Sequence, residues 1–376
     1  MASPAGPVAA PSTRLLSLDA LRGFDMLWIT GADTIGTAFA KLVDVAPARF
    51  VAQQLDHVDW AGFHFYDLIF PLFVFMVGAA VPLSLDRMVS TDGQSAAIGR
   101  IVRRTLLLYV LGLFYYGGFS TPLAEIRWVG VLQRLAWCYG TTSLLYLWLR
   151  PSGLVAAAFA LLAGYWALLT FGHAPGFAPG DFAEGHNLTN WFDAHYLPGR
   201  KWDGDHDPEG VLSMFPAISS CLLGVFASLW LRDARRPALA RGWWLVGAGL
   251  VLVALGQLWG LQFPIIKKLW TSSFVLVAGG WSGVLLGLFY LVIDVWQVRA
   301  WATPFVWVGC NPLAIYLAAN IVDFDKLATR FVGGDIAAAL NRTWTGSGSL
   351  LLAFSGASLC ILFCGYLYRR KIFLRL

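Results

Sequence analysis

Residues 66–85 read YDLIFPLFVFMVGAAVPLSL, with Asp67 as the one charged side chain in the stretch. A helix that crosses the hydrocarbon core of a bilayer needs about 20 predominantly apolar residues. The stretch therefore predicts a membrane-spanning helix, and it indicates an integral membrane protein.

Apolar stretches of similar length recur along nearly the whole chain, and they decide the fold class. Hydrophobic residues make up 58% of the sequence and charged residues 13%, against roughly half and a quarter in soluble domains. We therefore expect an all-α, polytopic transmembrane bundle of about ten helices, formed by residues 15–376 as a single domain. The expected spans lie near 17–38, 66–85, 101–119, 129–149, 153–171, 211–231, 242–260, 271–293, 301–320 and 348–367.

Basic residues predict the orientation. They crowd one set of connections, as at Arg103, Arg150 and Arg236, and such connections face the cytoplasm under the positive-inside rule. Both termini are then cytoplasmic, and a bacterial inner membrane is the expected location. Residues 1–14 lack the pattern of a cleaved signal peptide and are expected to form a disordered cytoplasmic tail. The longer outer connections are expected at 39–65, 172–210 and 321–347.

Several classes of function lose support from the sequence. The net charge of +5 comes from Lys and Arg at helix ends, without the interleaved aromatic pattern of a nucleic-acid groove, so no nucleic acid is expected. The five cysteines lack paired metal or disulfide spacing. Walker A, HExxH and GxSxG motifs are absent from the sequence, which argues against an ATP-driven pump, a zincin and a serine hydrolase.

The segment His57 to Pro71 holds the densest polar pattern at the outer side. If it is helical, His57, Trp60, His64 and Asp67 recur at i, i+3, i+7 and i+10 and share one face. An interfacial aromatic belt is one interpretation. The other is a proton-transfer site, because histidine titrates near neutrality and a neighbouring carboxylate can orient its ring.

A second pattern is the acidic stretch 201–210, KWDGDHDPEG. Asp207 before Pro208 matches a helix N-cap, and Glu209 then suits the first turn. The density of acids also suits a cationic, hydroxyl-rich ligand such as an amino sugar. A metal held by Asp205, His206 and Asp207 is disfavoured because adjacent residues cannot easily all face one ion, so no metal is expected.

Ionisable and polar groups inside apolar spans form the third signal, because they are costly in hydrocarbon and tend to face a cavity or a partner. They are Asp25, Asp33, Arg134 and Asn311. Buried pairing that only fixes helix register is the alternative for each. Lys267 and Lys268 stand at an outer helix end, where their charged groups can reach water.

These motifs resemble the heparan-alpha-glucosaminide N-acetyltransferase family, and in particular its bacterial relatives. The matching stretches follow the family order along nearly the whole chain: 17–23, 57–71, 130–134, 207–212, 267–272, 311–312 and 368–373. One departure is Asp33, where lysosomal members carry asparagine, so acceptor preference is expected to differ.

The resemblance implies a transmembrane enzyme that uses cytoplasmic acetyl-CoA as co-substrate to acetylate the amine of a glucosamine-type sugar on the far side. His57 matches the family's active histidine, Asp207 and Glu209 match its acidic motif, and Arg134 matches a basic residue. His57 would act as base or acetyl carrier. His64 or Asp67 would orient it.

The remaining expected roles concern substrates and partners. Trp60, Lys267, Asn311 and Asp33 complete the set of supporting or substrate-binding residues. The partners would be an amino sugar or envelope glycan, the lipid bilayer, and a second copy of the chain in a homodimer. An amino-sugar permease remains the rival function, because buried charges and polar outer loops also fit a transporter.

Overall fold

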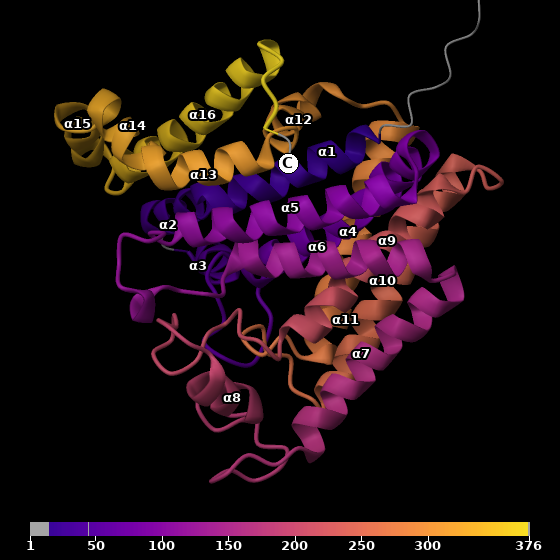
Figure 1. The fold of residues 1–376 in the computed structure, drawn as a ribbon. Coiled ribbons are helices and arrows are strands. Elements are labelled where there is room, and N and C mark those ends of the chain that lie inside the picture. Colours follow the sequence, from indigo (N-terminus) through magenta and orange to yellow (C-terminus); the bar gives the residue numbers. More distant parts are fainter. Residues whose placement is uncertain (1–14, 44, 375–376) are drawn as a thin grey trace, which may run out of the picture.

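The computed structural model describes residues 15–43 and 45–374, and the regular structure of this part of the chain is helical (Figure 1). The expected tail at 1–14 lies outside the described residues. The helices of the first half are α1 (Leu16–Leu27), α2 (Asp33–Leu42), α3 (Ala46–Gln54), α4 (Phe65–Asp92), α5 (Gln94–Tyr115), α6 (Val131–Trp148), α7 (Pro151–Phe171) and α8 (Leu188–Tyr196). Those of the second half are α9 (Met214–Arg232), α10 (Ala238–Gly260), α11 (Ser272–Phe289), α12 (Thr303–Gly309), α13 (Pro312–Val322), α14 (Phe324–Val332), α15 (Asp335–Thr343) and α16 (Ser347–Arg369).

The all-α prediction is confirmed, and each expected span coincides with helix. By length and composition, six helices in the described part of the chain can cross a membrane: α4, α7, α9, α10, α11 with its π-helical extension to Val295, and α16. The pair α12 and α13 adds a seventh if it is one span. The number of ten crossings and the orientation of the termini stay predictions.

Two of the expected spans are interrupted helices. α1 leads through a π-helical turn, Trp28–Ala32, into α2, and Gly31 in that turn has a φ of 121°, which L-residues with a side chain rarely adopt. α12 and α13 meet at an angle of 73° at Cys310 and Asn311. Proline at the start of α13 explains this break, since its ring cannot continue the preceding helix.

The core of the bundle depends on close helix contact at glycine. α4 packs against α9, and a Cβ on Gly78 would lie 1.8 Å from the backbone oxygen of Cys221. A Cβ on Gly224 would lie equally close, 1.8 Å, to the backbone oxygen of Phe75. Small residues let two helices approach in this way where lipid supplies no hydrophobic driving force between them.

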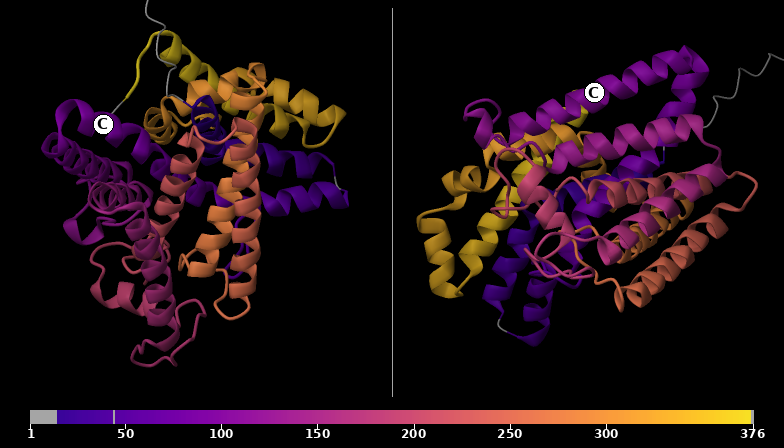
Figure 2. Two further views of the ribbon diagram at one scale, coloured as in Figure 1. Left: turned by 90° about the vertical axis from the view of Figure 1, so that its right-hand side faces the viewer. Right: turned by 60° about the horizontal axis from the view of Figure 1, so that its bottom comes forward.

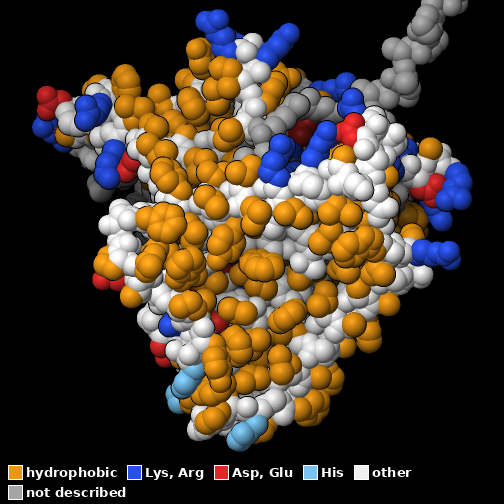
Figure 3. Space-filling model, in the orientation of Figure 1, with side chains coloured by type: hydrophobic (Ala, Val, Ile, Leu, Met, Phe, Trp, Pro, Cys, Tyr) orange, Lys and Arg blue, Asp and Glu red, His pale blue; other side chains and the backbone are white. Residues whose placement is uncertain are grey.

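The surface agrees with a membrane-embedded bundle. Hydrophobic side chains cover much of the face in Figure 3, and most Lys and Arg side chains lie in its upper half. The segment that contains α8 lies at one end of the molecule, away from α16 (Figures 1 and 2). The expected outer connections hold short helices, namely α3, α8, α14 and α15.

Candidate active site

A cavity of about 360 Å³ opens where the start of α4 meets the 201–210 and 262–271 segments. His57, Asp67, Arg127, Glu209 and Lys267 all line it. Aromatic side chains form much of the remaining wall, among them Trp60, Phe70, Tyr115, Tyr116, Trp202, Trp270 and Tyr316. A mainly apolar wall with a few convergent polar groups is the usual form of a small-molecule site.

The shared helical face expected for residues 57–67 is wrong. Residues 55–64 contain no helix, and α4 begins at Phe65. Asp67 lies in the first turn of α4, where its carboxylate accepts the backbone N–H of His64 at 3.1 Å and that of Val58 at 3.3 Å. The segment therefore folds back over the end of α4, and helix capping, not helical spacing, brings His57 to Asp67.

His57, Asp67 and Lys267 form the central charged group of this site. His57 Nδ1 lies 2.8 Å from Asp67 Oδ1, and Lys267 Nζ lies 3.3 Å from the same oxygen. The Lys267 ammonium is also 3.0 Å from His57 Nδ1 and 3.3 Å from Nε2. Asp67 is buried, whereas the His57 side chain is 51% exposed. A buried carboxylate thus holds an accessible imidazole at the cavity.

A backbone link explains why Lys267 reaches His57. Ala61 pairs with Ile266 in an isolated antiparallel bridge, and the Gly62 N–H donates to the Ile265 carbonyl at 2.8 Å. Gly62 has a φ of 132°, which favours glycine at this point. Burial lowers the pKa of the Lys267 ammonium, and neighbouring Asp67 opposes that effect.

The acidic stretch forms a turn and not a helix N-terminus. The Gly210 N–H donates to the Asp207 carbonyl at 2.8 Å, and α9 begins only at Met214. The expected N-cap role of Asp207 is therefore wrong. The carboxylate of Asp193, on α8, instead accepts the Val211 N–H at 3.1 Å and the Asp207 N–H at 3.4 Å.

Asp193 was not expected from the sequence, and its carboxylate binds two backbone N–H groups of the acidic turn. Gly210 is required beside it, because a Cβ there would lie 1.8 Å from Asp193 Oδ2. Burial raises the pKa of Asp193 to about 6. The N–H groups of Asp207 and Val211 therefore offset the cost of burying the Asp193 carboxylate. The same two bonds fix the turn that carries Glu209.

Arg127 is the second functional side chain that sequence reasoning missed. Its guanidinium binds Asp207 through Nε at 2.8 Å and Nη2 at 2.7 Å, and Nη2 binds Glu209 Oε2 at 2.6 Å. The rings of Tyr116 and Trp202 lie 4.4 and 5.0 Å from its Cζ. Such fork geometry and stacking are particular to arginine.

The two acids of the motif have different surroundings. Asp207 is fully buried, and the bonds to Arg127 hold its pKa below the usual range in spite of that burial. It does not line the cavity. Glu209 does line it, and burial raises the pKa of Glu209, which the nearby Arg134 opposes. Glu209 is thus the acid placed to meet a ligand.

Arg134 lies behind the turn and not at the cavity. It is fully buried on α6, and its Nη2 donates to the Pro208 carbonyl at 3.1 Å and to the Ser213 hydroxyl. Its guanidinium also packs over the Trp270 ring at 4.6 Å. Arg134 therefore stabilises the 208–213 segment. Because it does not line the cavity, it is not placed to contact a coenzyme bound there.

Trp60 and His64 differ in their relation to the cavity. Trp60 lines it and is fixed by an indole N–H bond to the Phe182 carbonyl at 2.8 Å. His64 Nδ1 is 3.0 Å from the Asp56 carbonyl oxygen, and the cavity lining does not include it. His57 and His64, which were expected to lie on one face, are therefore separated, because His57 alone of the two lines the cavity.

One group of side chains has metal-ligand chemistry. Ligand atoms of Glu184, Asp203 and His206 lie within 4.8 Å of one another. The ammonium of Lys268 binds this group, at 2.8 Å from Glu184 and 3.0 Å from Asp203. These two carboxylates raise the pKa of Lys268 although burial acts the other way. The lysine already supplies the cation that the carboxylates need.

The structure does not bring Asn311 to His57, and the role expected for Asp33 stays a prediction. The Asn311 amide donates to the Ile372 carbonyl at 2.9 Å and accepts the Leu374 N–H at 3.1 Å, so it holds the C-terminal segment. Asp33 begins α2, and its side chain lies outside what the structure describes. Asp25, in α1, is fully buried.

A second cavity, of about 500 Å³, lies farther along α4, between Phe70 and Ser84. Arg22, Ser84 and Arg104 line it, together with residues of the C-terminal segment. Phe70, Val131 and Tyr316 line both cavities. These three side chains therefore lie between the two cavities, and Tyr316 stacks there on Tyr115 with ring centroids 4.5 Å apart.

Fold and site together describe a helical protein with several candidate membrane spans and a histidine–aspartate pair beside a mainly apolar cavity. Residues 14–125 match the model of a domain of unknown function, DUF5009. Human heparan-alpha-glucosaminide N-acetyltransferase is 25% identical over 373 residues, which cover 84% of this chain and 54% of that protein. The mouse enzyme of the same name is 26% identical over 382 residues, covering 85% and 57%.

The chain is accordingly a distant relative of the heparan-alpha-glucosaminide N-acetyltransferases, which confirms the resemblance found in its motifs. It spans a little over half the length of these relatives. Their names describe transfer of an acetyl group to the amine of a glucosaminide.

Proposed function

We propose that this protein is a transmembrane N-acetyltransferase that moves an acetyl group from cytoplasmic acetyl-CoA to the amine of a glucosamine-type sugar on the outer side. The single observation that carries the proposal is the pairing of His57 with buried Asp67 at a cavity that Glu209 also lines. The relationship to N-acetyltransferases supplies the reaction type.

The geometry suits His57 as the group that handles the proton. Its hydrogen bond to Asp67 favours a proton on Nδ1 and leaves Nε2 to accept one. In the direct route, the amine nitrogen attacks the thioester carbonyl, Nε2 takes the amine proton, and the C–S bond breaks to release coenzyme A. Asp67 would stabilise the imidazolium that forms, as a carboxylate does behind a catalytic histidine.

His57 also suits a covalent route. Nε2 would attack the thioester, release the coenzyme A thiolate, and carry the acetyl group until the amine displaces it. In either route negative charge develops on the carbonyl oxygen, and a cation beside the imidazole can stabilise it. The Lys267 ammonium, within 3.3 Å of both ring nitrogens, is in place for that role.

The second cavity supports entry of the donor from the side opposite the acceptor. Arg104, together with Arg22, which lies 3.4 Å from the Asp19 carboxylate in the same wall, gives it cationic groups suited to phosphate. Phe70, Val131 and Tyr316 separate it from the cavity of His57, so a movement of these side chains would give the thioester arm a route toward His57. The nucleotide would stay at the basic end, and the acetyl group alone would need to reach the imidazole.

We expect Glu209→Gln to raise the KM for the amino sugar about tenfold or more, because a charged hydrogen bond is worth about 1.5–3 kcal/mol. The amide oxygen can still accept from Arg127, so the turn should stay folded. Glu125→Gln, at an exposed acid outside the cavity, is the matched control. Steady-state kinetics would check this, and an unchanged KM would assign Glu209 to structure alone.

One observation favours the rival function, an amino-sugar permease. The 73° bend between α12 and α13 interrupts a helix in the way seen in many transporters. Their substrate sites lie at such breaks, however, and here the break contributes Cys310 and Pro312 to the second cavity, away from His57. The break therefore suits donor binding at least as well as sugar transport.

Purified protein incubated with labelled acetyl-CoA and a panel of amino sugars tests the function directly. Labelled N-acetyl sugar, formed in proportion to protein, is the expected result. Absence of transfer to every amine in the panel, with the protein folded, would contradict the proposal.

A further inference from the structure

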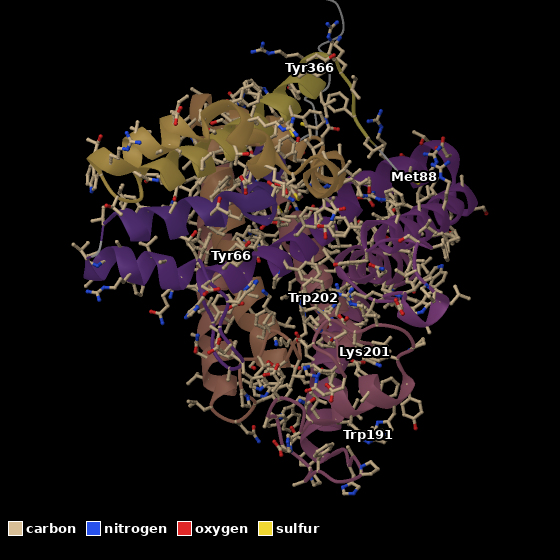
Figure 4. The ribbon with its side chains drawn as sticks, turned by 90° about the vertical axis from the view of Figure 1, so that its left-hand side faces the viewer. Tyr66, Met88, Trp191, Lys201, Trp202 and Tyr366 are labelled. Carbon is tan, nitrogen blue, oxygen red and sulfur yellow. The ribbon has the colours of Figure 1, made fainter. Side chains whose placement is uncertain are left out.

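Three side chains with metal-ligand chemistry converge next to the candidate active site. Glu184 lies in the connection before α8, and Asp203 and His206 lie in the connection after it. Asp203 also lines the cavity of that site. In Figure 4, Trp202, the residue before Asp203, lies between Tyr66, near the start of α4, and α8. The group therefore joins the two connections of α8 beside the cavity.

The imidazole of His206 is buried with one ring nitrogen unused. The residue is 4% exposed, and its Nδ1 lies 2.6 Å from Asp205 Oδ1. Because an ionised carboxylate can only accept a hydrogen bond, Nδ1 carries the proton and Nε2 of the neutral ring holds a lone pair. Nε2 has no hydrogen-bond partner among the described residues. A buried nitrogen in this state has lost its water without a replacement, which costs free energy unless a ligand compensates.

The unused nitrogen points into the acidic group. Nε2 lies 3.7 Å from Glu184 Oε1 and 3.8 Å from Asp203 Oδ2. Two atoms that bind one Zn²⁺ at about 2.0–2.2 Å and at the tetrahedral angle lie about 3.4 Å apart. The distances from the imidazole exceed this value by a few tenths of an ångström. No separation within the group is greater than 4.8 Å, and the half-exposed Glu184 side chain is free to move inward.

Lys268 binds the two carboxylates of the group and leaves the imidazole without a partner. Its ammonium lies 2.8 Å from Glu184 Oε1 and 3.0 Å from Asp203 Oδ2, yet it makes no hydrogen bond to His206 Nε2. An ammonium also brings a single positive charge to a group that includes the Asp205 carboxylate as well. A divalent cation would bind both carboxylates and the imidazole nitrogen together.

The set of donor atoms selects a transition metal. One imidazole nitrogen and two carboxylate oxygens suit Zn²⁺, whereas Ca²⁺ and Mg²⁺ prefer oxygen ligands alone and in larger number. The bond between Asp205 and His206 adds a feature of zinc sites, in which a carboxylate accepts the second ring N–H and orients the imidazole. Glu184 comes from a separate segment, so the site does not require adjacent residues to face one ion.

We propose that Glu184, Asp203 and His206 bind one Zn²⁺ in place of the Lys268 ammonium, with Asp205 as the positioning residue for the imidazole. The ion would tie together the connections on both sides of α8 and release Lys268 at the cavity wall. The site takes no part in the proposed acetyl transfer, and neither proposal depends on the other.

Isothermal titration of ZnCl₂ into the purified full chain in detergent tests the site. We expect one Zn²⁺ per chain, and a higher thermal unfolding midpoint in its presence. Lys268→Met should tighten binding about tenfold, because the ion no longer displaces a charged hydrogen bond. Asp205→Ala should weaken binding about 10–100-fold, the usual cost of losing a carboxylate behind a liganding imidazole. His206→Ala should abolish binding.

His195→Ala is the matched control, because His195 is an exposed imidazole on α8 outside the group, and its affinity for Zn²⁺ should equal that of the unsubstituted protein. Glu184→Gln repeats the test at a half-exposed ligand, where loss of a buried ring cannot unfold the segment.

Three results would overturn the inference. The first is unchanged affinity in Asp205→Ala or Glu184→Gln. The second is an equal loss of binding in His195→Ala and His206→Ala, which would show adventitious binding to histidines. The third is binding by Lys268→Met alone, which would make the lysine the resident cation. Acetyl transfer by the unsubstituted protein would stand in each case.

Discussion

His57→Ala should reduce acetyl transfer by about 10²–10⁴-fold if His57 acts as a general base, and by more if it carries the acetyl group. The reason is geometric. No other imidazole among the described residues lines the cavity of about 360 Å³ that contains His57, so the variant would have no ring to replace it. Initial rates with saturating donor and acceptor would measure the effect.

Folding should survive this substitution. The His57 side chain is 51% exposed, and Asp67 keeps Lys267 and the N–H groups of Val58 and His64 as partners. His64→Ala is the matched control, because that ring bonds the Asp56 carbonyl outside the cavity. Near-normal turnover by the His57 variant, or an equal loss in both variants, would contradict the proposed role.

A comparison of the unsubstituted protein with His57→Ala separates the direct route from the covalent route. Mixing with labelled acetyl-CoA in the absence of an acceptor, followed by rapid denaturation, should leave label on the unsubstituted protein only if an acetyl-imidazole forms. His57→Ala should then lose that label. Retention of label in the variant would place the acetyl group on another residue.

Arg127→Met should have the largest effect on stability. The change leaves Asp207 and Glu209 without the guanidinium that binds both. Removing one partner of a buried ion pair costs about 3–5 kcal/mol because the remaining charge stays buried and unpaired. We expect a large fall in the thermal unfolding midpoint in detergent, together with weaker acceptor binding in whatever protein stays folded.

Two further variants make this prediction specific. Arg127→Lys keeps the charge but not the fork that binds Asp207 through two nitrogens, so it should recover only part of the loss. Arg232→Met removes an exposed pair with Asp86, and exposed pairs contribute about 0–1 kcal/mol. An Arg127→Met protein that unfolds at the same temperature as Arg232→Met would show that the buried network is not needed.

The helices could be predicted from the sequence because their apolar stretches match the thickness of a bilayer. The same reasoning did not predict that the spans containing α1 and α12 are interrupted. A positive φ at Gly31 and the turn before Pro312 break these two helices, although the sequence on both sides of each break is apolar. Hydropathy measures composition along the chain, and it is insensitive to a local change of direction. The count of crossings therefore needs more than composition.

The position of His57 beside Asp67 was anticipated for an incorrect reason. Their spacing suggested one helical face, whereas the contact arises because Asp67 caps α4 and the preceding segment folds back. Arg127 and Asp193 could not be found in the same way. Their partners are 80 and 18 residues away in sequence, and neither stands in a recognisable motif. From the sequence alone, a charged residue in a connection between spans is expected to face solvent. Only the tertiary structure shows that buried acids surround Arg127.

The central claim is that donor and acceptor reach His57 from opposite sides of the membrane. It rests on the basic residues that mark one side of the bundle and on the two neighbouring cavities, which share Phe70, Val131 and Tyr316 as lining residues. Coenzyme A carries several charges and does not cross hydrocarbon unaided. A route through the protein is therefore necessary if the amino sugar is outside.

Proteoliposomes that hold the protein in one orientation test this claim most directly, with acetyl-CoA confined to the cytoplasmic face and amino sugar to the other. We predict acetylated sugar on the acceptor's own side, no net uptake of unmodified sugar, and no product from His57→Ala vesicles. Product that forms only when both substrates share one side would contradict transfer across the membrane, and accumulation of unmodified sugar inside the vesicles would identify a permease instead.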